Sequence, residues 1–283
     1  MKTWADIAVV GGVNLDVLGM PDGDFVPRDS MIGRIIFRAG GVGRNIAAQA
    51  ARARADVSLY TVFGNDRYGE WLKEACLRDG IRIDRSVTLN GPSSVYLAIH
   101  DSRGDMAAAI NDMGLILRFT PDVLSPLLES IDRSSVCVLD TNLPQESLIY
   151  LSENVTCPLV LDPVSLQKAL RVIPILDRLT AMKPNLDEAR FLTGEKDVRA
   201  CARQLHKKGL PMAFISMGRE GLYYSDGETC GLIPPGVISD APQTGAGDAV
   251  TAGIAIGLSQ GLSARECAML GVQCAEKHLG AAD

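Results

Sequence analysis

The sequence predicts an α/β domain with a mainly parallel β-sheet that is covered by helices on both faces. Short apolar runs alternate with helical stretches along most of the 283 residues, and polar residues follow the ends of several runs. Strands that alternate with helices form right-handed βαβ units, which build a parallel sheet. The hydrophobic content of 47% can fill one large core, so a single domain over residues 1–283 is expected.

Six apolar runs are expected to form strands, and six stretches to form helices. The strands are predicted at residues 6–10, 57–62, 135–139, 159–161, 179–182 and 213–217. The helices are predicted at residues 46–53, 68–78, 145–153, 185–192, 198–208 and 250–260. Strands that are apolar throughout are typical of a sheet that is buried on both faces.

Two segments, 17–38 and 94–110, break this alternation and are expected to form a small β lid. Residues 95–99 alternate in the way that favours a half-buried strand, and residues 101–104 (DSRG) are typical of a hairpin turn. Neither segment joins the parallel core easily, because each lacks the helix that connects parallel strands.

Composition excludes several classes of partner. The net charge of −6 argues against broad binding to nucleic acid, and no apolar run approaches the length of a membrane span. The first residues, MKTWADIAVVGG, are expected to form a strand rather than a signal peptide. Seven scattered cysteines without a CxxC pair indicate reduced thiols in a cytoplasmic protein.

Polar side chains follow the first strand and four further strands. In open α/β sheets, ligands bind beyond the carboxyl ends of the strands, so these positions predict a site. They are Asn14, Asp16, Asp140, Asn142, Asp162, Lys183, Asn185, Ser216 and Gly218. Asn14 and Asp16 can hydrogen-bond a sugar diol, although a turn that closes the first strand is the alternative.

The loop at residues 244–249 reads TGAGDA and opens into an apolar, Ala-rich helix. The first N–H groups of a helix lack partners, and Gly245, Ala246 and Gly247 leave room for an anion to reach them. Asp248 then stands where it can accept a proton from an attacking hydroxyl, as phosphoryl transfer requires. The alternative is a helix start whose small residues serve only packing.

A second Gly-rich loop, AGGVGRN, lies at residues 39–45. Neither loop has the spacing of a Walker A motif or of a dinucleotide fingerprint. In this order, the two loops resemble the ribokinase-like (PfkB) family of sugar and nucleoside kinases, and the resemblance extends from Ile7 to the last residues. It implies a three-layer ribokinase-like fold with a β lid.

The resemblance also implies roles for individual residues. Asp248 is expected to be the general base that takes the proton of a primary hydroxyl during its attack on the γ-phosphate of ATP. The N–H groups of residues 245–247 are expected to stabilise the charge of the transferred group. The residues expected to hold the sugar are Asp16, Gly40, Gly41 and Asn45, together with Asn14.

On the nucleotide side, residues 183–188 (KPNLDE) resemble the Pro-Asn-x-x-Glu element of the family. Asn185 and Glu188 are expected to face Mg²⁺ and its waters, with a helix cap as the alternative. Lys183, Ser216, Gly218 and Gly221 are expected beside the nucleotide, with Arg219 as a further phosphate contact. The adenine pocket is expected at residues 233–238 and in the last helix, around residues 271–274.

Several stretches are similar to the pseudouridine kinase branch of the family, namely residues 96–99 with Asp101 and Gly104, residues 108–109 and 111–113, and residues 162–165 with Lys168. They predict transfer to the 5′-hydroxyl of pseudouridine, with Tyr96 and Asp112 among the substrate-binding residues. The alternatives are another nucleoside or sugar kinase of ribokinase type, and a nucleoside-binding protein with impaired catalysis.

The sequence departs from the family pattern at Pro242 and at the end of the chain. Pro242 stands where relatives have an Asp or Asn that positions the loop and a nearby monovalent cation, which puts K⁺ activation in doubt. The chain ends at residues 280–283, earlier than expected for the family, which would expose the adenine site. Unpaired edges of the lid strands predict a homodimer through the lid.

Overall fold

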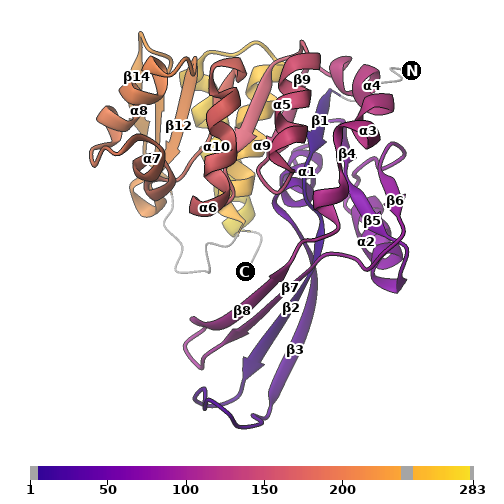
Figure 1. The fold of residues 1–283 in the computed structure, drawn as a ribbon. Helices are drawn as coiled ribbons and strands as arrows, with labels where there is room; N and C mark the ends of the chain where they lie inside the picture. Colours follow the sequence, from indigo (N-terminus) through magenta and orange to yellow (C-terminus); the bar gives the residue numbers. More distant parts are fainter. Residues whose placement is uncertain (1–5, 237–244, 281–283) are drawn as a thin grey trace.

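The structure, a computed structural model, describes residues 6–236 and 245–280. Its main sheet has eight strands with helices on both faces, as the sequence predicts (Figure 1). All neighbouring pairs are parallel except those that β13 makes with β12 and β14. The order is β14 (Cys230–Ile233), β13 (Leu222–Ser225), β12 (Met212–Ser216), β11 (Ala181–Met182), β10 (Leu159–Asp162), β9 (Val136–Asp140), β1 (Ile7–Val10) and β4 (Val57–Tyr60).

The sheet separates two hydrophobic clusters, because successive strand residues point to opposite faces. In β1, Ala8 and Val10 belong to one cluster, and Ile7 and Val9 to the other. The second cluster is covered by α1 (Val42–Arg52), α2 (Arg67–Arg78), α9 (Ala246–Ser259) and α10 (Ala264–Gly280). The first is covered by α3 (Pro121–Leu124), α4 (Leu128–Asp132), α5 (Gln145–Asn154), α6 (Leu166–Ala169), η3 (Leu170–Arg178), α7 (Leu186–Thr193) and α8 (Val198–Lys207).

The predicted lid segments form a separate four-stranded sheet that projects from the main body (Figure 1). Its order is β3 (Gly33–Gly40), β2 (Asn14–Pro21), β7 (Val95–His100) and β8 (Met106–Asp112). The predicted hairpin turn joins β7 to β8, and the N–H of Gly104 donates to the carbonyl of Asp101 at 3.0 Å. The strands extend beyond the predicted segments, since β2 starts at Asn14 and β8 ends at Asp112.

Several elements differ from the sequence prediction. The expected strand at 57–62 is divided into β4 and β5 (Val62–Gly64), and β5 pairs with β6 (Val87–Leu89) in a small parallel sheet. The pair β13 and β14 was not predicted, although Asp226-Gly227 between them is a turn signal. Helix α1 starts at Val42, four residues early, because Gly41 at its N-cap and Gly43 in its first turn conceal the apolar period.

Within residues 6–236 and 245–280, no helix is long and apolar enough to cross a membrane. All seven cysteines lie in the described residues, and none is in a disulfide. Cys230 is exposed and four of the others are buried.

Candidate active site

The N-terminus of α9 has the form that the 244–249 motif predicts. Gly245 is the N-cap and has a φ of +86°, which favours glycine. A Cβ at Gly245 would lie 2.9 Å from Nε2 of His278, so a larger residue would also crowd α10. Ala246 and Gly247 form the first turn, and Asp248 follows in the same turn. The free N–H groups of this turn make a site that favours an anion.

Asp248 lies among other charged groups. Burial is the main cause that raises its pKa, to about 7, and the carboxyl groups of Asp162 and Asp140 act in the same direction. The ammonium of Lys183 and a hydrogen bond with Asn45 partly oppose this rise. A carboxyl group with a pKa near neutral can accept and release a proton at physiological pH, as a general base must.

A buried ion pair stands behind this turn. Nζ of Lys183 lies 3.0 Å from Oδ2 of Asp162, and each side chain is less than a tenth exposed. The hydroxyl of Thr251 in α9 donates to the same Asp162 oxygen at 2.8 Å, which ties α9 to the end of β10. Burial alone would lower the pKa of Lys183, but the carboxylates of Asp162, Asp248 and Glu188 raise it, so the lysine stays charged. A Cβ on Gly247 would lie 3.1 Å from Lys183 Nζ, so this cation adjoins the first turn of α9.

A cavity of about 810 Å³ lies between the lid and helices α1 and α2. Its lining includes Asp16, Asn45 and Tyr96, which the sequence predicts to bind the acceptor, and Gly245 of the α9 loop. We call it the acceptor cavity after that prediction. Nδ2 of buried Asn14 donates to Oδ1 of Asp16 at 2.6 Å, which orients the carboxylate. Burial raises the pKa of Asp16, although Asn14 and two arginines oppose the rise.

Gly40 and Gly41 allow close approach where the lid meets α1. A Cβ at Gly40 would lie 2.3 Å from Oδ2 of Asp16, and one at Gly41, whose φ is +99°, would lie 2.5 Å from the carbonyl oxygen of Gly12. Oδ2 of Asp140 accepts from the N–H of Gly12 at 2.8 Å and from that of Gly43 at 2.6 Å. This fully buried carboxylate therefore joins β9, the end of β1 and the start of α1.

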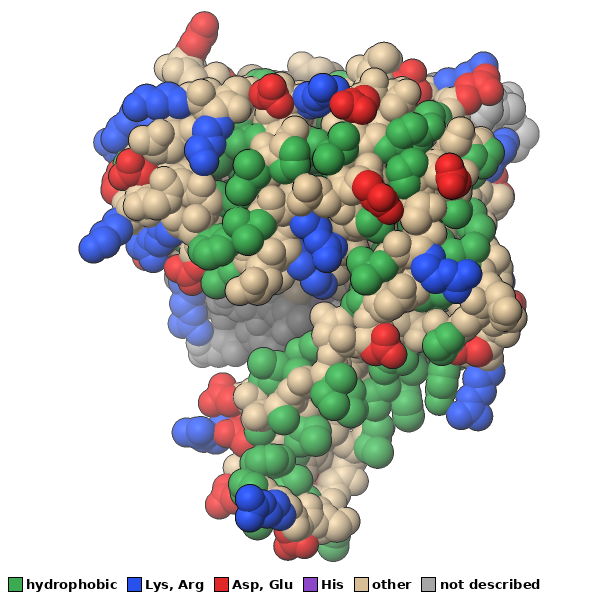
Figure 2. Space-filling view, viewed as in Figure 1, with side chains coloured by type: hydrophobic (Ala, Val, Ile, Leu, Met, Phe, Trp, Pro, Cys, Tyr) green, Lys and Arg blue, Asp and Glu red, His purple; other side chains and the backbone are tan. Residues whose placement is uncertain are grey.

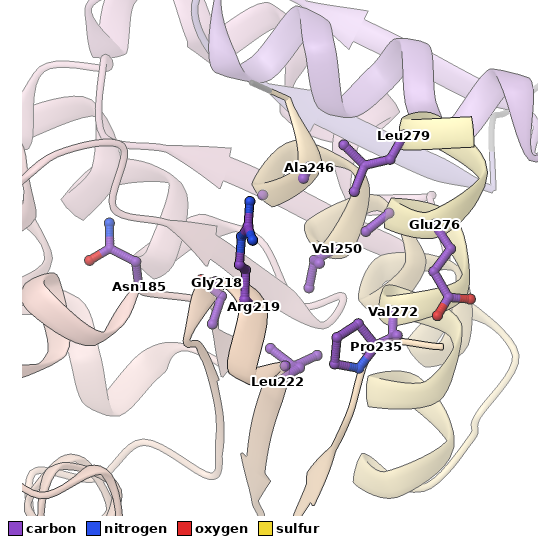
Figure 3. A pocket seen from close by; sticks show the side chains of 14 residues that line it. Asn185, Gly218, Arg219, Leu222, Pro235, Ala246, Val250, Val272, Glu276 and Leu279 are labelled. Carbon is purple, nitrogen blue, oxygen red and sulfur yellow. The ribbon is translucent and has the colours of Figure 1, made fainter. Parts of the chain in front are cut away.

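A second cavity, of about 410 Å³, lies on the other side of the α9 N-terminus. Its lining includes Asn185, Ser216, Gly218, Gly221 and Arg219, which the sequence predicts to lie beside the nucleotide. We call it the nucleotide cavity after that prediction. Figure 3 shows Arg219 and Gly218 near Ala246, with apolar side chains of α9 and α10 further along the wall. The apolar lining residues are Val250 of α9, Val272, Ala275 and Leu279 of α10, Leu222 of β13, and Pro235, which follows β14. Of the expected adenine region, residues 237–238 lie outside the described residues.

Asn185 and Glu188 form a reciprocal cap at the start of α7. The side chain of Asn185 accepts from the N–H of Glu188 at 2.8 Å, and Glu188 accepts from the N–H of Asn185 at 2.9 Å. These two residues therefore cap the helix, which is the alternative to the expected role beside Mg²⁺. Burial raises the pKa of Glu188. Within the described parts of the chain, no group of three or more His, Cys, Asp or Glu side chains could hold a metal on its own.

Seven of the expected site residues line neither cavity, namely Asn14, Gly40, Gly41, Asp112, Lys183, Glu188 and Asp248. Asp112 is exposed at the end of β8, where its Oδ1 accepts from the N–H of Gly114 at 3.3 Å, and it is not among the residues that line the acceptor cavity. Lys183 and Glu188 lie behind the nucleotide cavity rather than in its lining. Pro242 and the expected chain end at 281–283 lie outside the described residues.

The acceptor cavity also contains residues that the sequence analysis missed. Gln49, Trp71, His278 and a group of arginines line it. Nε2 of Gln49 lies 2.8 Å from Nδ1 of His278, which links α1 to the end of α10. The spacing of Asn45, Gln49 and Arg52 on one face of α1 was the only available signal, since the partners come from distant segments.

The two cavities meet at the first turn of α9. Gly245 lines the acceptor cavity, whereas Ala246 and Gly247 line the nucleotide cavity. A phosphoryl group held by this turn would therefore face one ligand on each side. The model of the pfkB family of carbohydrate kinases matches residues 5–280 of this chain. The chain belongs to this family.

Relatives and solved structures support the assignment. The chain is 36% identical over 258 residues to a pseudouridine kinase of Escherichia coli, with coverage of 88% of this chain and 82% of the relative. It is 30% identical over 284 residues to a cytidine kinase of Thermococcus kodakarensis, with coverage of 97% and 96%. A ribokinase structure from Thermotoga maritima superposes with a TM-score of 0.89 at 21% identity, with coverage of 98% and 93%. The fold of this PfkB protein is therefore ribokinase-like, as expected.

Proposed function

We propose that this protein transfers the γ-phosphoryl group of ATP to the primary hydroxyl of a ribose-containing acceptor, and that pseudouridine is the acceptor. The observation that carries the proposal is the junction of the two cavities at the first turn of α9, with Asp248 in that turn. The similarity to the pseudouridine kinase of Escherichia coli supports the choice of acceptor.

In this mechanism, the acceptor lies under the lid with its ribose hydroxyls toward Asp16 and Asn45. Its primary hydroxyl attacks the γ-phosphorus and gives its proton to Asp248. The new P–O bond forms as the bond to the bridging oxygen breaks, and ADP leaves. The N–H groups of residues 245–247 and the cation of Lys183 stabilise the charge on the transferred group, which is the main contribution that a protein makes to this reaction.

The charges near Lys183 also fit a bound divalent cation. Asp162, Asp248 and Glu188 all interact with the single ammonium of Lys183, so carboxyl groups outnumber cations. Mg²⁺ usually takes one or two protein oxygens and completes its shell with water and phosphate oxygens. Asn185 and Glu188 would face its waters, and the ion would neutralise phosphate charge when bound. Activation by K⁺, a cytoplasmic location and a homodimer stay predictions.

The acceptor is tested by ADP release with ATP and Mg²⁺ in the presence of pseudouridine, uridine, cytidine, adenosine, inosine, ribose or fructose 6-phosphate. We expect the highest kcat/KM with pseudouridine. A higher value with ribose or another nucleoside would keep the kinase and replace the acceptor. No release with any of these acceptors, from protein that binds ATP, would favour a nucleoside-binding protein instead.

A further inference from the structure

The acceptor cavity holds more positive charge than a neutral acceptor needs. Four arginines line it, Arg38 from the lid, Arg44 and Arg52 from α1, and Arg78 from α2. The lining carboxylates are Asp16 and Asp79. This excess of cations lies in a protein whose net charge is −6.

Two of the four arginines are already matched by the two carboxylates. Arg44 forms an ion pair with Asp79 and also donates to Oδ1 of Asn45 at 3.2 Å. Arg38 lies opposite Asp16 in the register of β2 and β3, and its charge lowers the pKa of that carboxyl. Arg52 and Arg78 are exposed, and their side chains make no hydrogen bond or ion pair with the residues that the structure describes.

Arg52 and Arg78 come from different helices that meet at one end of the cavity. Each lies in the last turn of its helix, α1 or α2, where a cation is favourable. A Cβ at Gly80, which follows α2, would lie 3.9 Å from Cβ of Ala51, so the two helix ends are neighbours. Helix-end stabilisation explains each arginine singly, but it does not explain why both line the same cavity.

This end of the cavity lies away from the transferred phosphoryl group. Asn45, which contacts Asp248, precedes Arg52 by seven residues on α1. Seven residues of α-helix span about 10 Å, which is close to the length of a nucleoside. A group that reaches Arg52 and Arg78 therefore belongs to the part of the acceptor opposite its primary hydroxyl. Trp71 in the same wall offers a flat apolar surface beside it.

We propose that Arg52 and Arg78 form an anion subsite, and that the enzyme also phosphorylates ribose-containing acceptors that carry a carboxylate or phosphate at this end. The proposal rests on the proposed kinase activity. The chemistry is the same transfer, in which the acceptor hydroxyl gives its proton to Asp248, the new P–O bond forms and ADP leaves. Guanidinium groups suit both anions because each presents paired N–H donors.

The test compares matched acceptors that differ by one anionic group. The pairs are uridine against orotidine, which adds a carboxylate, and ribose against ribose 1-phosphate. We expect kcat/KM to be about tenfold higher for the anionic member of at least one pair, since a hydrogen bond to a charged group contributes about this factor. The pair that responds distinguishes carboxylate from phosphate. Equal or lower values for both anionic members, with good turnover of a neutral acceptor, would overturn the subsite and leave the proposed function intact.

Variants test whether the preference for anionic acceptors depends on Arg52 and Arg78. In the double variant Arg52→Gln/Arg78→Gln, the ratio of anionic to neutral kcat/KM is expected to fall about tenfold or more, and the salt dependence of that ratio to weaken. Arg203→Gln, an exposed arginine on α8 outside the cavity, is the matched control and should keep the wild-type ratio. An unchanged ratio in the double variant would contradict the assignment.

A binding measurement separates this proposal from the proposed function. Thermal shift of the protein by orotidine and by ribose 1-phosphate, without ATP, reports the subsite even if no acceptor is phosphorylated. We expect stabilisation of the wild type and of Arg203→Gln, and its loss in the double variant. No stabilisation of the wild type by either compound would overturn the subsite.

Discussion

Asp248 is a buried carboxyl group whose protonation is set by its neighbours. Burial, Asp162 and Asp140 favour the neutral form, while Lys183 and Asn45 favour the charged form. The resulting pKa of about 7 means that the unliganded protein holds a proton there at acidic pH. The proposed acid–base role of Asp248 and the stability of the protein therefore both depend on the protonation of this one residue.

This coupling predicts a pH dependence of stability. An aspartate in the unfolded chain titrates near pH 3.9, so between about pH 4 and 7 only the folded state holds the proton. The free energy of unfolding that Asp248 contributes is complete below about pH 4 and is lost as pH rises through 7. Asp248→Asn cannot titrate, so its melting temperature minus that of the wild type should increase over this range. Melting curves of the unliganded proteins at pH 4 to 8 measure this, and a constant difference would contradict the raised pKa.

At the scale of elements, the start of α9 is the joint between the two cavities. Gly245 supplies a left-handed residue that lets the chain enter the helix beside His278. The Asp162–Thr251 hydrogen bond then fixes the helix to the sheet, and Asp140 fixes α1 in the same way. Small errors in this placement would move the N–H groups away from the transferred phosphoryl group.

Gly245→Ala is therefore expected to lower kcat by about 10²-fold, the cost of a misplaced catalytic group. The added Cβ meets His278 at 2.9 Å and the residue keeps a positive φ. Gly261→Ala is a matched control, because Gly261 also has a positive φ, of +72°, but nothing lies within 4 Å of its Cβ position. Both variants should lose some stability in urea, but only Gly245→Ala should lose activity. Equal activity losses would show that backbone strain alone is responsible.

Most strands of the main sheet were predictable, because a strand that is buried on both faces appears in the sequence as a short apolar run. The expected strands at 6–10, 135–139, 159–161 and 213–217 differ from the observed ones by one residue at most at either end. The β13–β14 pair and the early start of α1 were missed, since short strands and glycine-rich helix starts have weak periodic signals. The α9 turn was predictable for the opposite reason, because its glycines and Asp248 are adjacent in the chain.

The group of arginines that lines the acceptor cavity could not be predicted from the sequence. Arg38, Arg52 and Arg78 are separated by more than ten residues from one another and come from a strand and two helices. Each one taken singly is typical of an exposed surface. Only the packing of the lid against α1 and α2 brings them to one cavity.

At the scale of the whole molecule, the lid leaves apolar side chains uncovered on its outer strands. Ile35 and Ile110 are about two-thirds exposed, and Met106 is 59% exposed. Figure 2 shows hydrophobic side chains gathered along the lid below the main body. Residues of β2, β3 and β7 also line a shallow apolar cavity of about 300 Å³ on the lid. Exposed apolar area of this kind marks an interaction surface.

We therefore predict a homodimer through the lid. Sedimentation velocity of the wild type should give the mass of two chains, and Ile35→Glu should give one, because a buried carboxylate at the interface is costly. Ile173→Glu is the control, since Ile173 is 53% exposed on η3, away from the lid, and should stay dimeric. A monomeric wild type at micromolar concentration would contradict the lid dimer.

We propose above that a phosphoryl group is transferred at the first turn of α9, between the two cavities, with Asp248 as the base. The most direct measurement is the yield of phosphorylated acceptor, detected by mass spectrometry after incubation of pseudouridine, ATP and Mg²⁺ with the wild type or with Asp248→Asn. We expect a 5′-phosphorylated product from the wild type and a rate about 10²–10⁴-fold lower from the folded variant. A variant that forms product as fast as the wild type would contradict the proposal.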